Sequence, residues 1–199
     1  MTKPLSIQAI EKIYPALQGL GQEFVFVGGA TLPFYLPETL WPKTRPTNDV
    51  DVVLKMLTRI EATKVEKKLL KLGFENVTGP GAPVCRFTFE GVVVDVLGTD
   101  VNAMGFKNRW YTEGFDRAIS VSISESITIK IFTVPYFLAS KIEAFRDRGK
   151  ADYRGSKDME DIISLLEATT YEELEGTFKV SSKVLREYLK AEFSNLLAE

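Results

Sequence analysis

Two aspartates, two positions apart, are the first residues in this sequence whose type and spacing suit chemistry. Asp49 and Asp51 stand in the segment TNDVDVVL, at the entry to an apolar run typical of a β-strand. Side chains alternate between the faces of a strand, so both carboxylates should point to one side. Like charges on one face tolerate ionisation best with a cation between them, and hard oxygen ligands suit Mg²⁺. A plain structural interpretation also exists, in which Asp49 caps a turn and Asp51 is a solvated strand residue.

A third aspartate, Asp95, interrupts the run VVVDVL at 92–97, which otherwise has the pattern of a buried strand. An unpaired buried carboxylate costs several kcal/mol, so something must compensate its charge. A metal ion shared with Asp49 and Asp51 would do so. The alternative is an edge strand on which Asp95 faces water or pairs with an arginine.

A pair of glycines precedes the acids. In FVFVGGAT an apolar strand runs into Gly28 and Gly29, and a helix is expected to start near Thr31. This geometry presents backbone N–H groups and a helix N-terminus, which together hold a phosphate. A Gly-Gly pair alone is most often only a tight turn. Twenty residues before Asp49, Gly29 would supply the phosphate half of a metal–triphosphate site.

A helix late in the chain carries a lysine on its apolar side. Lys141 falls inside the stripe formed by Phe137, Leu138, Ile142 and Phe145. Lys141 either extends past the core to solvent or reaches the triphosphate, with Arg148 two turns further along the same face. Asp158 and Asp161 lie three positions apart at the start of the next predicted helix. A helix N-terminus favours acids there, most strongly at Asp158, independently of any ligand.

The elements that must position these residues give an α+β pattern with a strand-rich centre and a helical C-terminal part. We take 1–134 as a catalytic core and 135–199 as a helical part packed on it, without a linker that marks two independent domains. Strands are expected at 24–27, 50–54, 84–89, 92–97, 118–123 and 127–134. Helices are expected at 6–20, from Thr31, and at 58–72, 135–148, 156–168, 172–174 and 181–197, with loops at 37–48 and 149–155.

Composition excludes several classes of protein. The 199 residues contain no histidine and only Cys85, which excludes an internal disulfide, the usual zinc ligand sets, and Ser-His-Asp or Cys-His catalysis. No apolar run approaches the roughly 18 to 20 residues of a membrane span, and the N-terminus lacks a secretory signal, so we expect a cytoplasmic protein with no membrane partner.

Charge is nearly balanced over the whole chain but not locally. The formal net charge is -2, which argues against a strongly basic protein that binds along DNA. Residues 141–157 nevertheless hold six Lys or Arg against three acids, and 179–190 hold four against one. These segments could bind an RNA acceptor.

The ordered set Gly28-Gly29, Arg45-x-Thr47-x-Asp49-x-Asp51 and Asp95 resembles the signature of the polymerase-β-like nucleotidyltransferase superfamily. The later segment FTVPYFLASKIEAFRDRGKADYRGSKDMEDIISLL looks like the second conserved block of the AbiEii-type nucleotidyltransferase family. Together the resemblance covers about residues 20–168. Members of that family include toxins of toxin–antitoxin systems, and some relatives modify tRNA 3′ ends.

The resemblance implies a polymerase-β-like fold, a mixed sheet flanked by helices, and transfer of a nucleoside monophosphate from a nucleoside triphosphate to a hydroxyl. It implies two Mg²⁺ or Mn²⁺ ions on Asp49, Asp51 and Asp95, with Asp95 accepting the acceptor's proton and Lys141 completing the catalytic set. A tRNA or other RNA acceptor and a cognate antitoxin are the implied partners. The residues implied in nucleotide binding are Gly28, Gly29, Thr31, Arg45, Lys141, Arg148, Asp158 and Asp161. Of these, Asp158 and Asp161 would either orient Lys141 or contact the nucleotide.

One departure from the superfamily pattern concerns the glycines. Many members have Gly-Ser where this chain has Gly28-Gly29, so a hydroxyl that contacts phosphate is missing unless Thr31 supplies it. Two other functions stay open. One is a catalytically silent binding or regulatory protein of the same fold, against which the retention of all three acids argues. The other is nucleotidyl transfer to a small molecule such as an aminoglycoside antibiotic.

Overall fold

The computed structural model describes residues 2–47, 49–100, 108–149 and 152–198. Within these residues one mixed sheet has seven strands in the order β3-β4-β5-β2-β1-β7-β6. The strands are β1 (Phe24–Val27), β2 (Asp49–Leu54), β3 (Glu75–Asn76), β4 (Arg86–Phe89), β5 (Val92–Gly98), β6 (Ile119–Ser122) and β7 (Thr128–Ile131). The predicted mixed sheet flanked by helices is confirmed.

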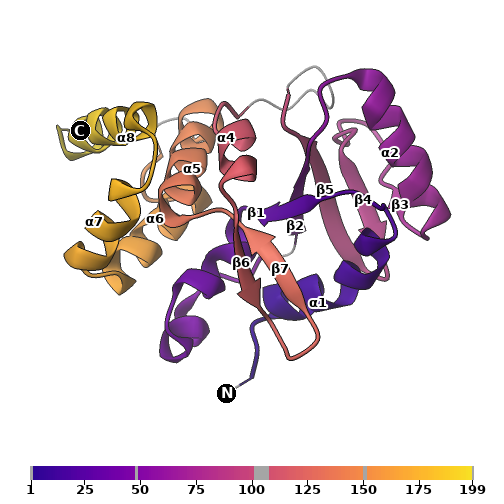
Figure 1. Cartoon of the computed structure of the whole chain (residues 1–199), viewed down its shortest axis with the longest axis horizontal. Helices are drawn as coiled ribbons and strands as arrows, with labels where there is room; N and C mark the ends of the chain where they lie inside the picture. Colours follow the sequence, from indigo (N-terminus) through magenta and orange to yellow (C-terminus); the bar gives the residue numbers. More distant parts are fainter. Residues whose placement is uncertain (1, 48, 101–107, 150–151, 199) are drawn as a thin grey trace.

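The helices lie around this sheet, and α5 to α8 gather at the opposite end of the molecule from α2 (Figure 1). The α-helices are α1 (Leu5–Gln18), α2 (Arg59–Lys71), α4 (Tyr111–Asp116), α5 (Val134–Arg148), α6 (Lys157–Ala168), α7 (Tyr171–Lys179) and α8 (Lys183–Ala198). Two 3₁₀ helices, η1 (Gly29–Tyr35) and η2 (Glu38–Lys43), follow β1. No helix among the described residues is long and apolar enough to cross a membrane.

Alternation along β2 divides the core into two layers and decides where the acids lie. Val50 and Val52 pack in the cluster that contains the buried side chains of α1 and α2, whereas Val53 packs in the cluster that contains those of α5. Asp49 and Asp51 share the parity of Val53, so they lie on the α5 side of the sheet. The predicted same-face arrangement of the two acids is confirmed.

Most of the predicted elements form for the reasons read from the sequence. The stripe on α1 is buried at Ile7, Ile10, Ile13 and Leu17. Thr58 caps α2 in a reciprocal capping box with Glu61, because each side chain accepts a hydrogen bond from the other's backbone N–H.

Five features differ from the prediction. The segment after Gly28 is the 3₁₀ helix η1 rather than an α-helix, since Pro33 lacks an N–H and its ring would clash with an α-helical carbonyl four residues back. The predicted loop 37–48 contains η2, and α7 runs well beyond 172–174. Neither β3 nor α4 was predicted. In α4 a glycine, Gly114, weakens the helix signal but fits tightly, because a Cβ there would lie 2.9 Å from the Phe132 ring.

Candidate active site

The acids of β2 and β5 meet because these strands are parallel neighbours. Asp51 pairs in register with Asp95, and Asp49 stands two residues earlier on β2. All three line one cavity of about 740 Å³, which we call the central cavity. We refer to Asp49, Asp51 and Asp95 as the acid cluster. Lys141 and Arg148 of α5 line the same cavity, so the sheet and the C-terminal helices both contribute to it.

Asp95 is paired with an arginine that the sequence reasoning did not single out. Arg86 on β4 faces Asp95 across the antiparallel β4–β5 pair. Its Nε lies 2.8 Å from Asp95 Oδ1 and its Nη2 lies 2.7 Å from Oδ2, a bidentate contact. The same Nη2 is 3.7 Å from Asp49 Oδ2. Hydrogen bonding to Asp95 raises the pKa of Arg86 above its ordinary value. Asp95 therefore pairs with an arginine, as the alternative proposed, but β5 lies between β4 and β2 and is not the edge strand that this alternative assumed.

Asp51 is the member of the acid cluster that lacks a partner. No hydrogen bond or ion pair joins it to another residue in the described part of the chain. Burial, together with the charges of Asp49 and Asp95, raises the pKa of the Asp51 carboxyl to about 7. Its carboxylate packs against Gly28, where an added Cβ would lie 2.0 Å from Oδ2. Only glycine fits this approach, and its φ of 71° also favours glycine.

These donors fit a divalent cation in part. Asp49 and Asp51 offer hard oxygen ligands on one face, and no residue in the described part of the chain forms an ion pair with Asp51. Asp95, by contrast, has both oxygens engaged by Arg86. Consistent with this, no group of three or more acids and cysteines among the described residues is arranged as a metal-binding cluster. Asp49 and Asp51 would hold an ion as the residues stand, and Asp95 would join them only after Arg86 moves.

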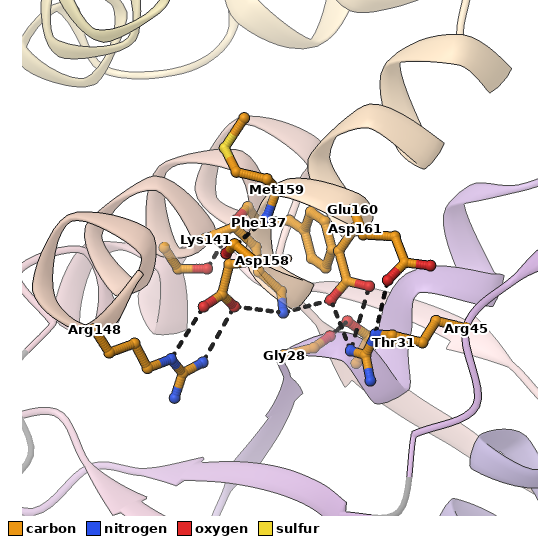
Figure 2. A network of polar contacts seen from close by, with 12 residues as sticks. Gly28, Thr31, Arg45, Phe137, Lys141, Arg148, Asp158, Met159, Glu160 and Asp161 are labelled. Atoms are coloured by element: carbon orange, nitrogen blue, oxygen red, sulfur yellow. Dashed lines mark hydrogen bonds and ion pairs between the residues drawn. The ribbon is translucent and has the colours of Figure 1, made fainter. Parts of the chain in front are cut away.

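A second group of charges, which we call the helix network, joins α5, α6 and the segment before β2 (Figure 2). Lys141 Nζ lies 3.1 Å from Asp158 Oδ1 and 2.5 Å from Asp161 Oδ2. Arg148 binds Asp158 through Nε at 3.0 Å and Nη2 at 3.1 Å. Arg45 Nη2 lies 3.4 Å from both oxygens of Asp161. The helix network thus consists of Arg45, Lys141, Arg148, Asp158 and Asp161.

The helix network is buried and its charges compensate one another. Lys141 is 6% exposed, and Asp161 is 1% exposed. Burial alone would lower the pKa of Lys141, but the two aspartates raise it above its ordinary value. Burial likewise opposes ionisation of Asp158, yet Lys141 and Arg148 hold its pKa below the ordinary value. Lys141 does not extend past the core to solvent, so that interpretation is wrong.

The Gly28-Gly29 turn forms as predicted, but Thr31 does not complete it toward the central cavity. The Thr31 hydroxyl is fully buried and donates a hydrogen bond to the Gly28 carbonyl at 2.9 Å. Gly29 does line the cavity. A Cβ at Gly29 would lie 3.0 Å from Arg45 Nη2 and from Asp161 Oδ2. Arg45 and Asp161 of the helix network therefore leave little space for a side chain at Gly29.

Most of the predicted site residues therefore come together. Gly28 borders a smaller adjoining cavity of about 180 Å³. Asp161 contacts Lys141 but does not line the central cavity, and neither does Thr31. The polar side chains that line this cavity and that the sequence reasoning missed as site residues belong to Thr47, Arg86, Asp152, Ser156 and Lys157. Arg86 had a usable signal: across the predicted Glu90-Gly91 turn, counting back along the hairpin places it opposite Asp95.

No protein-family model matches the sequence, and no curated protein matches it. The AbiEii resemblance therefore stays a prediction. Several solved structures do match, but their sequence identities are low, so the similarity supports the fold alone.

One is a nucleotidyltransferase-like antigenic protein from Paracoccidioides brasiliensis, with 20% identity, a TM-score of 0.57, and coverage of 97% of this chain and 87% of that one. The solution structure of the antibiotic-resistance factor ANT(2'')-Ia has 12% identity, a TM-score of 0.56 and coverage of 96% and 95%. ANT(2'')-Ia in complex with adenylyl-2''-tobramycin has 13% identity, a TM-score of 0.54 and coverage of 94% and 98%. The chain has the nucleotidyltransferase fold of these structures.

Proposed function

We propose that this chain is a metal-dependent nucleotidyltransferase that moves a nucleoside monophosphate from a nucleoside triphosphate to a hydroxyl. The observation that carries the proposal is the opposition of two charged groups across one cavity. On one side the acid cluster includes Asp51, an acid without a partner among the described residues. On the other side stand Lys141 and Arg148. A volume of about 740 Å³ lies in the usual range for nucleotide-sized ligands.

Asp49 and Asp51 are the residues that would hold Mg²⁺ or Mn²⁺, with Asp95 as the third ligand of a two-ion site. A divalent ion at this position neutralises phosphate oxygens and lowers the pKa of a hydroxyl that binds it. The carboxylates keep their orientation because they stand on central strands rather than on loops.

The triphosphate would lie against the cations of α5. The Arg148 side chain is 62% exposed, so it can turn a guanidinium edge toward a phosphate while keeping Asp158 as its anchor. Lys141 is held in place by two aspartates and adds positive charge to the cavity wall at short range. Arg45, only 17% exposed, is set between Gly29 and Asp161 and limits how deeply a phosphate can enter.

The reaction needs positioning and charge neutralisation more than covalent chemistry by the protein, which suits a chain without histidine. The acceptor oxygen attacks the α-phosphorus, and a new P–O bond forms as the bond to the bridging oxygen breaks. Pyrophosphate leaves with that electron pair. The acceptor's proton passes to Asp95 or to water, and Arg148 and Lys141 balance the charge that develops on the leaving group.

For the acceptor we propose an RNA hydroxyl, with a tRNA 3′ end as the first candidate and a toxin of a toxin–antitoxin system as the biological role. The support is the sequence resemblance and the basic residues of 141–157, of which Lys141, Arg148 and Lys157 line the central cavity. A small-molecule acceptor is the second candidate, because a structure of the same fold contains an adenylylated antibiotic.

One experiment tests the reaction and separates the acceptors. The full-length chain is incubated with each α-labelled nucleoside triphosphate and Mg²⁺, together with total RNA, purified tRNA, or an aminoglycoside panel. Asp51→Asn serves as the inactive control, and Asp116→Asn, a surface aspartate paired with Lys55, serves as the matched control. Label in RNA that depends on Asp51 supports the proposal. Absence of transfer to every acceptor class and of pyrophosphate release would overturn it.

A further inference from the structure

Arg86 lines the central cavity, and the proposed reaction leaves it without a role. It stands on β4, inside the sheet, and its side chain is 33% exposed. Its guanidinium spans the gap between Asp95, at 2.7 Å, and Asp49, at 3.7 Å. No other lysine or arginine among the described residues forms an ion pair with the acid cluster.

The contact is built into the strand register rather than into a mobile loop. Arg86 and Asp95 are directly opposed in the β4–β5 ladder, which runs without a break from 86–95 to 89–92. A guanidinium cannot lose its charge in a protein, and its planar fork matches both oxygens of a carboxylate. A metal ion that approaches Asp95 therefore meets a fixed positive charge and two engaged oxygens.

We propose that Arg86 competes with a metal ion for Asp95, so that without nucleotide the protein binds one divalent ion, at Asp49 and Asp51. This inference rests on the proposed function. In the resting protein Arg86 supplies the positive charge that a second ion would bring. The second ion binds only when Arg86 leaves Asp95 for another anion, such as a phosphate of the incoming triphosphate. Arg86 thus ties completion of the metal site to the presence of substrate.

The test counts ions directly. Metal-free full-length protein is titrated with Mn²⁺ without nucleotide, and free Mn²⁺ is followed by electron paramagnetic resonance. The parent should bind one ion, and Arg86→Gln should bind two, with affinity for the second raised at least about tenfold because a like charge is removed. Arg86→Lys keeps the charge and should behave as the parent. Arg117→Gln, which removes a surface arginine paired with Glu113, is the matched control.

A second readout guards against a variant that folds poorly. The melting temperature is measured with and without Mn²⁺ for each protein. Arg86→Gln should melt lower than the parent without metal, because three carboxylates then face one another, and it should gain more than the parent when Mn²⁺ is added. Circular dichroism checks that the fold is kept.

The outcomes separate the two proposals. Two ions of similar affinity in the nucleotide-free parent, or an unchanged count in Arg86→Gln, would overturn the role of Arg86 and leave the proposed reaction standing. If neither protein bound any ion, the metal-dependent reaction itself would fall together with the inference.

Discussion

The acid cluster and the helix network face each other across the central cavity but are built in opposite ways. In the helix network three cations meet two buried aspartates, and each aspartate is paired. In the acid cluster three carboxylates share one arginine, and Asp51 is left out of that pairing. The helix network has its aspartates paired without a ligand, whereas the acid cluster has an excess of negative charge that a cation could neutralise.

This difference predicts how the removal of a charge from each group changes the stability of the protein. Buried ion pairs cost desolvation energy and are strongly destabilising only when one partner is removed. An excess of like charge, in contrast, is relieved by removing a member or by binding an ion. Removal of the unpaired Asp51 should therefore change stability with the opposite sign to removal of a paired member of the helix network, although both should impair transfer.

The largest effect is expected for Asp51→Asn on catalysis. The variant loses the acid best placed to hold the metal, so nucleotidyl transfer should fall at least about a thousandfold. Circular dichroism should match the parent. Transfer of α-label is measured beside Asp116→Asn, which should keep full activity. Near-normal turnover of purified Asp51→Asn would show that the metal assignment is wrong.

Next in size is the loss of stability in Lys141→Met. The sequence alone suggested little loss, but the substitution leaves Asp161 and Asp158 buried without their shared cation. We expect the free energy of unfolding to fall by about 3–5 kcal/mol. Urea unfolding measures it, with Lys183→Met on the exposed face of α8 as the control. Adding Asp158→Asn and Asp161→Asn to Lys141→Met should recover much of the loss; a double-mutant series without recovery would contradict the ion-pair account.

A smaller effect distinguishes two acids that are neighbours in register. From the sequence we expected Asp95→Asn to be as stable as the parent, or more so, without metal. Because Asp95 binds Arg86 through both oxygens, the variant should instead be less stable by about 1–2 kcal/mol in metal-free buffer. Asp51→Asn should be as stable as the parent or more stable. Melting curves in the presence of a chelator measure both, and equal shifts of the same sign would contradict the distinction.

A pH dependence of stability is also expected, and it is confined to the acid cluster. The pKa of Asp51 is raised to about 7, so the folded state keeps a proton that the unfolded state loses from about pH 4 upward. The free energy of unfolding of metal-free protein should thus fall as pH rises from about 4 to about 7. Asp51→Asn should remove this slope.

The helix network provides the contrast in the same titration. The pKa of Asp158 is lowered, so its contribution to stability is present above the unfolded-state value and is lost only as pH falls below about 4. Urea unfolding at intervals between pH 5 and pH 8 therefore isolates Asp51. A parent and an Asp51→Asn variant with parallel profiles would contradict the assignment.

Much of the fold was readable from periodicity, because the core faces of α1, β2 and β5 follow the simple repeats of helix and strand. The errors lie where local pattern competes with another constraint. Pro33 turns the expected helix after Gly28 into a 3₁₀ helix. Gly114 weakens the helix signal of α4 in the sequence. The helix forms because Tyr111 and Phe115 are buried one turn apart.

The candidate site was predictable where chemistry and alternation coincide, as for Asp49 and Asp51 on one face. It was not predictable where partners come from distant elements. The apolar stripe around Lys141 does not show that its amino group binds two aspartates of α6, and only the family resemblance implied that Asp158 and Asp161 orient the lysine. Arg86 was overlooked because Asp95 was judged from its own strand and not from the strand across the hairpin.

The contact between Arg45 and Asp161 has a consequence for how this protein is made. It joins residues 116 positions apart, and Asp161 belongs to α6, whereas the acids of β2 are synthesised much earlier. On the ribosome the chain therefore completes its sheet and the cations of α5 before the two aspartates that pair with those cations are synthesised. A product that terminates before α6 carries Arg45, Lys141 and Arg148 without Asp158 and Asp161, so interrupted translation should yield fragments in which the cavity is not assembled.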